Sequence, residues 1–232
     1  MVEKNIAIIP ARGGSKRIPK KNIVDFNGKP MIAWTIEAAL KTRLFDHVIV
    51  STDFEEIADI AKQYGAEVPF LRKKTIDDIS HVSLATLEAL EQSEEYYHEK
   101  YDHVVQLMAN TPLRGSQEIK AMFDYFRRNN SESLLSCFKF GWMNPWWAFE
   151  KDDEDKANMK FPEAVKQRSQ DLNDLFCTTG AIWISKCEVL KEHQTFFSPN
   201  HRFFEINWKA AVDIDEYDDL DFAIAVSKLK QK

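Results

Sequence analysis

A run of basic residues close to the N-terminus carries the clearest chemical signal in the sequence. Residues 10–22 have the sequence PARGGSKRIPKKN, in which five cationic side chains surround Gly13 and Gly14 directly after a short apolar stretch. Glycine lets backbone N–H groups approach phosphate oxygens, and Arg and Lys neutralise the charge that grows as a pyrophosphate leaves. The pattern favours a binding loop for a triphosphate.

Two common nucleotide-binding motifs are absent from this loop. The sequence contains no G-x-x-x-x-G-K-[ST] and no G-x-G-x-x-G, which argues against kinase-like and dehydrogenase-like sites. On composition alone, a basic surface turn is an equally good interpretation. The position of the loop directly after an apolar run typical of a buried strand favours the functional one.

A pair of aspartates near the C-terminus is the second candidate centre. In an extended segment, residues two apart point to one side, so Asp213 and Asp215 bring two carboxylates together. Mg²⁺ prefers hard oxygen ligands and commonly bridges carboxylates to substrate phosphates. The alternative is that Asp215 caps the terminal helix, with Asp218 completing a capping box. Taken alone, capping is the commoner role for such an aspartate.

The rest of the chain alternates between apolar runs typical of strands and amphipathic stretches typical of helices. This alternation predicts an α/β fold with a mostly parallel sheet and with ligand loops at the carboxyl ends of its strands. The expected strands span residues 6–10, 47–51, 68–71, 104–108, 134–138, 181–185 and 209–215. The expected helices begin at 28–30, at Thr52 or Asp53 as the cap of a helix that stops at Gly65, at 83, at 116 and at 217.

Residues 141–171 interrupt this alternation and predict an excursion from the sheet. The charged run 151–156 is typical of a solvated hairpin tip, because repelling carboxylates gain nothing by ordering. Trp142, Trp146 and Trp147 fit either an interface patch or burial within the same chain.

The bulk composition restricts the classes of protein that fit. We expect residues 1–232 to form a single domain. A formal net charge of -6 gives no reason to expect binding to nucleic acid or to a membrane surface. Cys137, Cys177 and Cys187 are odd in number and lack metal-site spacing, and no apolar run reaches membrane-spanning length, so a cytoplasmic protein is expected.

The basic loop also belongs to an ordered series of motifs that resembles the acylneuraminate cytidylyltransferase family, which includes the CMP-sialic acid synthetases. The further segments are Val50–Asp53, Thr111–Arg114, Arg168–Leu172, Gly180–Trp183 and Asp213–Asp215. The resemblance implies a three-layer α/β/α Rossmann-like nucleotidyltransferase fold. It also implies a homodimer in which the 141–171 excursion reaches the partner subunit.

The resemblance further implies roles for individual residues, with Mg²⁺ or Mn²⁺ as the cofactor and with CTP and an acidic nine-carbon sugar as substrates. The nucleotide would be held by Ala11, Arg12, Gly13, Gly14, Ser15, Lys16, Lys21, Asn22 and Arg72, the sugar by Met108, Asn110, Arg114, Arg168 and Gln170, and the metal by Asp213 and Asp215, with Arg12, Lys21 and Asp215 acting in catalysis.

One position departs from the family pattern and bears on the sugar. Sialic acid enzymes carry Gln-Pro-Thr-Ser before Pro-Leu-Arg, whereas this chain has Met108-Ala109-Asn110-Thr111. A thioether cannot replace the donor and acceptor of an amide, so an apolar contact is expected there. The legionaminic and pseudaminic acid branches, whose substrates end in a methyl group, fit better than plain sialic acid. Residues 180–183 give a slight preference for a legionaminic-like acid.

Two other functions remain open at the level of sequence. A Kdo-type cytidylyltransferase would share the nucleotide chemistry with an eight-carbon acid. A catalytically silent nucleotide-sugar binding protein could use the same fold, although the presence of both Asp213 and Asp215 argues against it.

Overall fold

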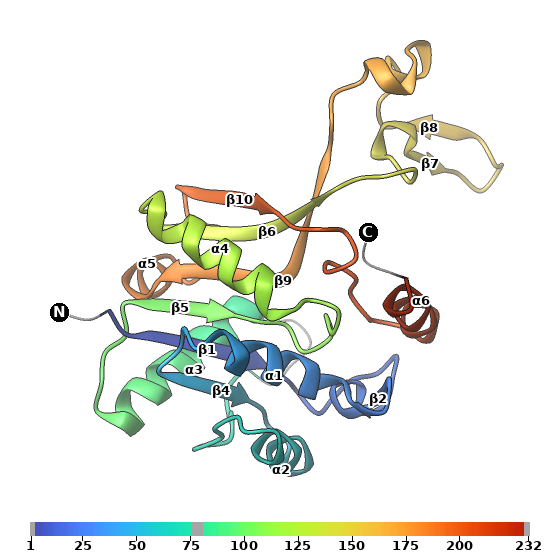
Figure 1. Cartoon of the computed structure of the whole chain (residues 1–232). Coiled ribbons are helices and arrows are strands. Elements are labelled where there is room, and N and C mark those ends of the chain that lie inside the picture. The colour runs from blue at the N-terminus through green and yellow to red at the C-terminus, as the bar shows by residue number, and fades with distance from the viewer. Residues whose placement is uncertain (1–2, 76–80, 230–232) are drawn as a thin grey trace.

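The computed structural model describes residues 3–75 and 81–229 and forms an α/β fold around one six-stranded sheet (Figure 1). The sheet contains β1 (Asn5–Pro10), β4 (His47–Ser51), β5 (His103–Gln106), β6 (Ser133–Lys139), β9 (Phe176–Lys186) and β10 (His201–Glu205). The helices are α1 (Met31–Thr42), α2 (Glu55–Gln63), α3 (Val82–Tyr97), α4 (Ser116–Arg128), α5 (Cys187–His193) and α6 (Tyr217–Ser227).

The strand order in the sheet is β10-β6-β9-β5-β1-β4. β1 pairs in parallel with β4 and β5, and β10 pairs in parallel with β6. β9 runs antiparallel to both β5 and β6. The expected mostly parallel sheet is therefore confirmed, with β9 as the strand that runs in the opposite direction.

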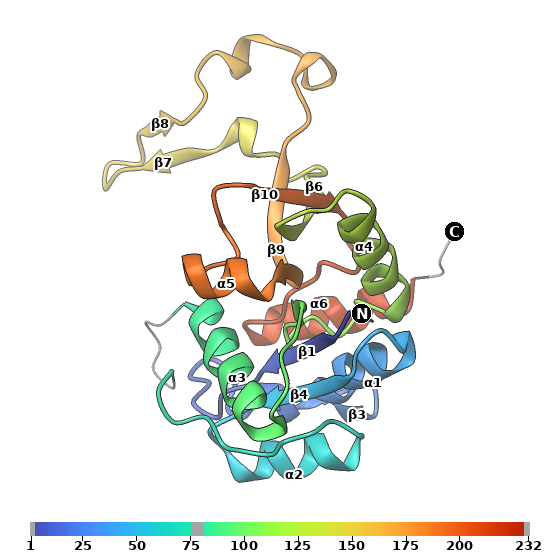
Figure 2. The same ribbon diagram turned by 90° about the vertical axis from the view of Figure 1, so that its left-hand side faces the viewer.

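Alternate side chains of β1 build the two apolar cores. Ile6 and Ile8 pack with residues of α3 and α5 on one face of the sheet. Ala7 and Ile9 pack with residues of α1, α2 and α4 on the other face. Every residue of β1 is buried, as a strand covered on both faces requires. The helices thus form one layer on each side of the sheet (Figure 2).

A third apolar cluster lies at the carboxyl end of the parallel strands and joins three separate parts of the chain. Ile18 comes from the basic loop, Ile214 lies between the two aspartates, and Leu220 comes from α6. Ile18 and Ile214 are fully buried. This cluster fixes the basic loop beside the aspartate pair.

Two expected strands are wrong. Residues 68–71 form no strand, and only Glu67 makes an isolated bridge, to Ile49. Pro69 removes a backbone donor in the middle of that run. Residues 209–215 form turns and extended chain instead, because Asn207 and Trp208 accept backbone bonds that close consecutive turns.

The elements β10 and α5 were not expected from the sequence, and neither was the small antiparallel pair β2 (Asp25–Phe26) and β3 (Lys29–Pro30). The last strand of the sheet is β10, an edge strand whose residues are exposed or half-buried, so it lacks the apolar run of a buried strand. The helix α5 has seven residues, too short for a clear helical period.

The excursion leaves the body where β6 and β9 continue beyond the sheet (Figure 1). It contains β7 (Phe149–Lys151), β8 (Ala157–Met159) and the short 3-10 helices η2 (Pro145–Trp147), η3 (Ala164–Lys166) and η4 (Ser169–Asp171). Residues 152–156 form the exposed tip of the β7–β8 hairpin, as expected for the charged run. Within the described residues, no helix is both long and apolar enough to span a membrane.

Candidate functional site

The basic loop begins where β1 ends and is held by one hydrogen bond to β4 and one from the Asn22 side chain. The Ala11 amide donates to the Ser51 carbonyl at 2.9 Å, and the Asn22 side-chain amide donates to the Arg12 carbonyl at 2.9 Å. Asn22 is buried and lies in the 3-10 helix η1 (Lys21–Ile23). The loop is thus held at both of its ends.

Gly13 lies at a point of this loop where a side chain does not fit. A Cβ added to Gly13 would lie 2.9 Å from both Cβ and Cγ of Phe54, whereas one added to Gly14 would meet nothing within 4 Å. The Gly13 amide donates to Asp53 Oδ1 at 2.8 Å. The expected capping of α2 by Thr52 or Asp53 is wrong, since Phe54 precedes the helix without a side-chain cap. Asp53 instead holds the basic loop.

A pocket of about 220 Å³ lies against this loop. Its walls come from the end of β1 and the basic loop, from the segment between α2 and α3, from α3 itself and from the loop after β5. The lining residues are Pro10, Arg12, Ser15, Lys21, Asn22, Arg72, Thr75, Val82, Ala85, Met108 and Asn110. Seven of the nucleotide and sugar residues expected from sequence line this pocket: Arg12, Ser15, Lys21, Asn22, Arg72, Met108 and Asn110.

The aspartate pair lies beside the pocket because its backbone is tied to the loop after β5. The Ile214 amide donates to the Asn110 carbonyl at 3.0 Å, and the Asn110 side-chain amide donates to the Ile214 carbonyl at 3.2 Å. Asn110 Oδ1 is buried and has no hydrogen-bond partner in the part of the chain that the structure describes. The arrangement leaves a buried acceptor close to Asp215.

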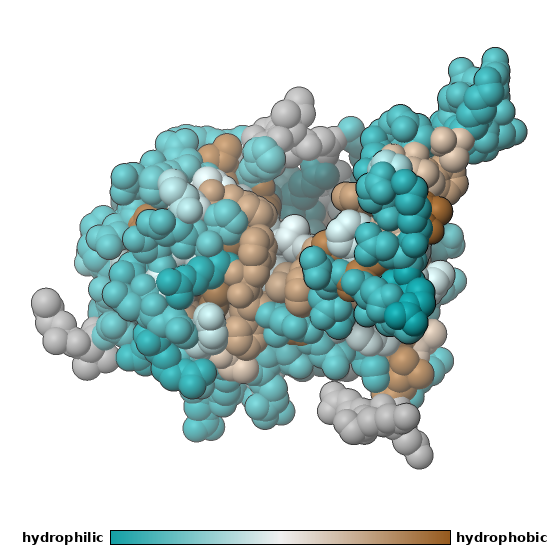
Figure 3. Space-filling model, turned by 90° about the horizontal axis from the view of Figure 1, so that it is seen from above, coloured by the Kyte–Doolittle hydropathy of each residue, from teal (hydrophilic) through white to brown (hydrophobic). Residues whose placement is uncertain are grey.

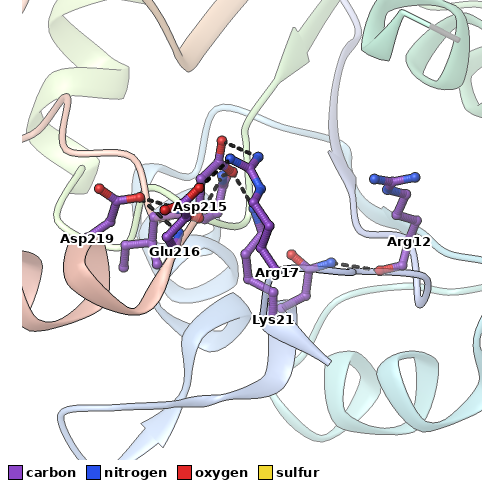
Figure 4. A network of polar contacts seen from close by, with 9 residues as sticks. Arg12, Arg17, Lys21, Asp215, Glu216 and Asp219 are labelled. Atoms are coloured by element: carbon purple, nitrogen blue, oxygen red, sulfur yellow. Dashed lines mark hydrogen bonds and ion pairs between the residues drawn. The ribbon is translucent and has the colours of Figure 1, made fainter. Parts of the chain in front are cut away.

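Asp215 sits in a network of ion pairs with the basic loop (Figure 4). Its Oδ1 accepts from Lys21 Nζ at 2.6 Å, and its Oδ2 accepts from Arg17 Nη2 at 2.8 Å. Partial burial opposes ionisation of Asp215, but the hydrogen bonds and charges of Lys21 and Arg17 outweigh it and lower the pKa of this carboxyl. Asp215 is therefore a carboxylate at neutral pH.

Asp213 has the opposite electrostatic setting. The surrounding protein atoms desolvate its carboxyl although the residue as a whole is exposed, and the nearby Asp215 carboxylate repels a second negative charge. Together these effects raise the pKa of Asp213 to about 6. Two crowded carboxylates with an unpartnered amide oxygen nearby are a donor set that suits a hard divalent cation.

The alternative that Asp215 caps the terminal helix is wrong. The N-cap of α6 is Glu216, and the capping box is completed by Asp219 rather than Asp218. Asp219 Oδ2 accepts from the amides of both Asp215 and Glu216 at 2.9 Å. The side chain of Asp215 is thereby left to face the basic loop.

Arg72 is buried in the pocket wall with part of its guanidinium unsatisfied. Its Nε and Nη1 have no hydrogen-bond partner among residues 3–75 and 81–229. Burial lowers the pKa of Arg72, an effect that the charges of Asp53 and Glu88 oppose and that Arg12 reinforces. A buried cation with unused donors is costly to the fold, and Arg114 also has one such donor, Nη1; Arg72 differs because it lines the pocket, where a ligand can reach it.

Glu88 of α3 shapes the loop that carries Arg72. Its two carboxylate oxygens accept from the amides of Lys73, Lys74 and Thr75 at 3.4, 3.2 and 3.0 Å and from the Thr75 hydroxyl at 2.6 Å. The sequence analysis gave neither Glu88 nor Thr75 a role. A carboxylate in a helix has no local pattern that identifies such long-range contacts.

Arg114 lies in the core rather than in the pocket. Its Nε donates to the Ala181 carbonyl at 3.2 Å, and its Nη2 donates to Thr35 Oγ1 at 2.9 Å and to the Met108 carbonyl at 3.3 Å. Burial lowers its pKa to about 10. Arg114 thus fixes the backbone of Met108, and the residue is only 1% exposed.

Met108 forms an apolar part of the pocket wall. A Cβ added to Gly180 of β9 would lie 2.9 Å from Met108 Cγ, so glycine at 180 makes room for this side chain. The Met108 carbonyl accepts from Thr35, Thr111 and Arg114. Gly180 therefore provides the space for the Met108 side chain, and the three hydrogen bonds fix the backbone of Met108.

Arg168 and Gln170 are not brought to the pocket within one chain. Both are exposed and lie at the η4 end of the excursion, which projects from the body (Figure 1). Arg168 makes a two-pronged ion pair with Asp171, at 2.7 and 3.2 Å. Their expected contact with the sugar would need a second copy of the chain.

Comparison with known proteins identifies relatives over almost the whole length. A family model described as Cytidylyltransferase matches residues 6–203. A pseudaminic acid cytidylyltransferase of Campylobacter jejuni is 36% identical over 99% of this chain and 98% of that protein. A CMP-N,N'-diacetyllegionaminic acid synthase of Legionella pneumophila is 32% identical over 90% of each chain. These identities give no support to the slight preference for a legionaminic-like acid.

The fold also matches solved structures. The structure of a CMP:2-keto-3-deoxy-manno-octonic acid synthetase complexed with CTP has a TM-score of 0.72, with 97% of this chain and 98% of that chain covered. The sequences are 18% identical, so this likeness concerns the fold alone.

The two buried arginines should respond differently to replacement by methionine. We expect Arg114→Met to lower the free energy of unfolding by about 1–3 kcal/mol, because three acceptors lose their donor. We expect Arg72→Met to change it by less than about 0.5 kcal/mol, since burying an apolar group of similar size offsets the loss of a poorly paired charge. Urea denaturation measures both values. An equal decrease in the free energy of unfolding in both variants would mean that Arg72 stabilises the fold rather than serving to bind a ligand.

Proposed function

The chain belongs to the cytidylyltransferase family, and on that premise we propose that it transfers the CMP part of CTP to an acidic nine-carbon sugar and releases pyrophosphate. The observation that carries this proposal is that the basic loop lines the pocket and also meets the aspartate pair, where Lys21 pairs with Asp215 and Ile18 packs with Ile214. The relatives of C. jejuni and L. pneumophila have names that refer to pseudaminic and legionaminic acids, both of this class.

The nucleotide would lie along the basic loop. Arg12 and Lys21 line the pocket and would meet the triphosphate oxygens, with Lys16 in the same loop and with the loop backbone from Ala11 to Ser15 close by. Asn22 holds the loop through the Arg12 carbonyl, and the unused donors of Arg72 would be satisfied by the nucleotide.

Asp213 and Asp215 would hold the divalent cation, Mg²⁺ or Mn²⁺. When bound, such an ion supplies positive charge that polarises the phosphate oxygens at a nucleotidyl-transfer site. The donor set fits, because the pKa of Asp213 is raised by desolvation and by the neighbouring Asp215, a condition that a cation relieves.

The reaction is an in-line displacement at the α-phosphorus of CTP. The anomeric oxygen of the sugar acid forms the new bond to phosphorus, its proton is lost, and the bond to the β-phosphate breaks so that pyrophosphate leaves. The contribution of the chain is positioning and charge neutralisation, with Arg12 and Lys21 steadying the leaving group. No covalent intermediate on the protein is required.

Met108 supports an acceptor with an apolar terminus. Met108 lines the pocket together with the apolar residues Pro10, Val82 and Ala85, and it presents a thioether at a position defined by Gly180 and Arg114. Pseudaminic acid is the first candidate on the identity of the C. jejuni relative, followed by legionaminic acid.

Pyrophosphate release with CTP and Mg²⁺ tests the function directly. The panel consists of sialic, legionaminic, pseudaminic and Kdo acids. We expect release with a nine-carbon acid, and we expect Asp213→Asn and Asp215→Asn each to lower kcat by at least about 100-fold because a charge that stabilises the transition state is lost. Release with Kdo alone would move the chain to that specificity, and silence throughout would favour a binding protein.

Replacement of Met108 by glutamine tests the substrate preference. We expect Met108→Gln to lower kcat/KM for the acid with a methyl terminus by roughly 10-fold, since an apolar contact is lost and an amide must be desolvated. Met108→Leu serves as the control and should stay close to the original value. An unchanged ratio between sialic and pseudaminic acids in Met108→Gln would show that Met108 does not select the sugar.

We also infer that two copies of the chain associate through the excursion. Trp142 is 87% exposed, and Met143, Phe149 and Val165 are more than half exposed on the same segment. Seen from above, further apolar surface lies between hydrophilic regions on the body, beside the projecting excursion (Figure 3). Such exposed aromatic and apolar surface is typical of an interface. Association would carry Arg168 and Gln170 towards another copy.

Sedimentation equilibrium tests this association. The whole chain should sediment as a dimer, and Trp142→Ser with Met143→Ser should shift the equilibrium towards the monomer because the exposed apolar surface is reduced. Replacing Lys156 at the hydrophilic hairpin tip with serine provides the control and should not change it. A monomer at every concentration would contradict the proposed dimer.

A further inference from the structure

Two cations of the basic loop have no role in the proposed chemistry, and the structure separates them. Lys20 pairs with Glu56 of α2 at 2.5 Å. Arg17 extends to the segment before α6, where it pairs with Asp215 at 2.8 Å and with Glu216 at 3.3 Å. Figure 4 shows its guanidinium between the loop and these two carboxylates.

Arg17 and Lys21 divide the two oxygens of Asp215 between them. Lys21 takes Oδ1, where the Asn110 amide also lies at 3.5 Å, and its side chain is 16% exposed. Arg17 takes Oδ2, and its side chain is 58% exposed. Lys21 and Arg17 therefore pair with different oxygens of Asp215, and Arg17 is the more exposed of the two cations.

A divalent cation on Asp215 needs an oxygen lone pair and is repelled by any cation beside it. Arg17 can leave at small cost, because an exposed ion pair contributes little to stability and the free guanidinium regains its hydration. Lys21 is more enclosed and is also placed to meet the triphosphate. Oδ2 is thus the oxygen of Asp215 that becomes available most easily.

We propose that Arg17 is a positioning residue that occupies Oδ2 of Asp215 until a divalent cation takes its place. Arg17 and the metal then exclude each other at this oxygen, and the Asp213–Asp215 pair binds a divalent cation once Arg17 has moved. In the absence of metal, the Arg17 pair keeps the basic loop seated against the start of α6 and limits the repulsion between the two carboxylates. The inference rests on the proposed function only in assigning the metal to these aspartates.

Calorimetric titration of the whole chain with Mn²⁺ alone, without CTP or sugar, tests this exchange. We expect Arg17→Gln to bind Mn²⁺ about 2- to 5-fold more tightly than the unchanged chain, which corresponds to the loss of one exposed competing ion pair. Lys20→Gln removes the same charge from the same loop and should bind Mn²⁺ no more tightly than the unchanged chain. Arg17→Lys, which retains a cation, should also stay close to it.

The background of Asp215→Asn isolates the interaction. There, Arg17→Gln should no longer increase the affinity for Mn²⁺, because the shared carboxylate is gone. Equal or weaker binding by Arg17→Gln relative to Lys20→Gln would overturn the proposal, as would the absence of measurable Mn²⁺ binding in all variants. Failure of the proposed function would appear separately, as an absence of pyrophosphate release by the unchanged chain with every sugar acid.

Discussion

Two fully buried isoleucines, Ile18 and Ile214, share one apolar cluster at the carboxyl end of the sheet, and the geometry of the site depends on that contact. Ile18 lies within the basic loop, and Ile214 separates the two aspartates. Burying these side chains turns their polar neighbours towards each other, so Lys21 meets Asp215 although 194 residues separate them. Hydrophobic burial supplies the stability that ordering so many charges requires.

The electrostatics of the site follow from this enforced proximity. Charged side chains of the basic loop face those of the aspartate pair. As a result, the pKa of Asp215 is lowered, while that of Asp213 is raised to about 6. Arg72 adds a buried cation whose donors are partly unused. Such unfavourable features persist where a ligand relieves them, which is the expected compromise between stability and function.

The main chemistry could be predicted from local sequence because the basic loop and the aspartate pair are short motifs with the residue types that phosphate and metal require. The residues that position these motifs could not, since their partners are distant in sequence. Arg114 resembles a ligand residue in its motif, yet the structure places it on the carbonyls of Met108 and Ala181. Glu88 has no motif at all, and its role depends on the packing of α3 against the segment between α2 and α3.

The fold was predictable to a similar extent and for similar reasons. The central strands are continuous apolar runs with both faces covered, so β1 and β4 could be located to within a residue. Edge strand β10 has exposed side chains and no such pattern, and the turns from Asn207 to Val212 depend on backbone bonds that composition does not reveal. Local rules succeed where burial is uniform and fail where tertiary contacts decide.

A crystal structure of the whole chain with CTP and Mn²⁺, with the metal located by its anomalous scattering, tests the central claim most directly. The account predicts Mn²⁺ coordinated by carboxylate oxygens of both Asp213 and Asp215, and the triphosphate along the loop that carries Arg12 and Lys21. Mn²⁺ bound away from the aspartate pair, or a triphosphate outside this loop, would contradict it.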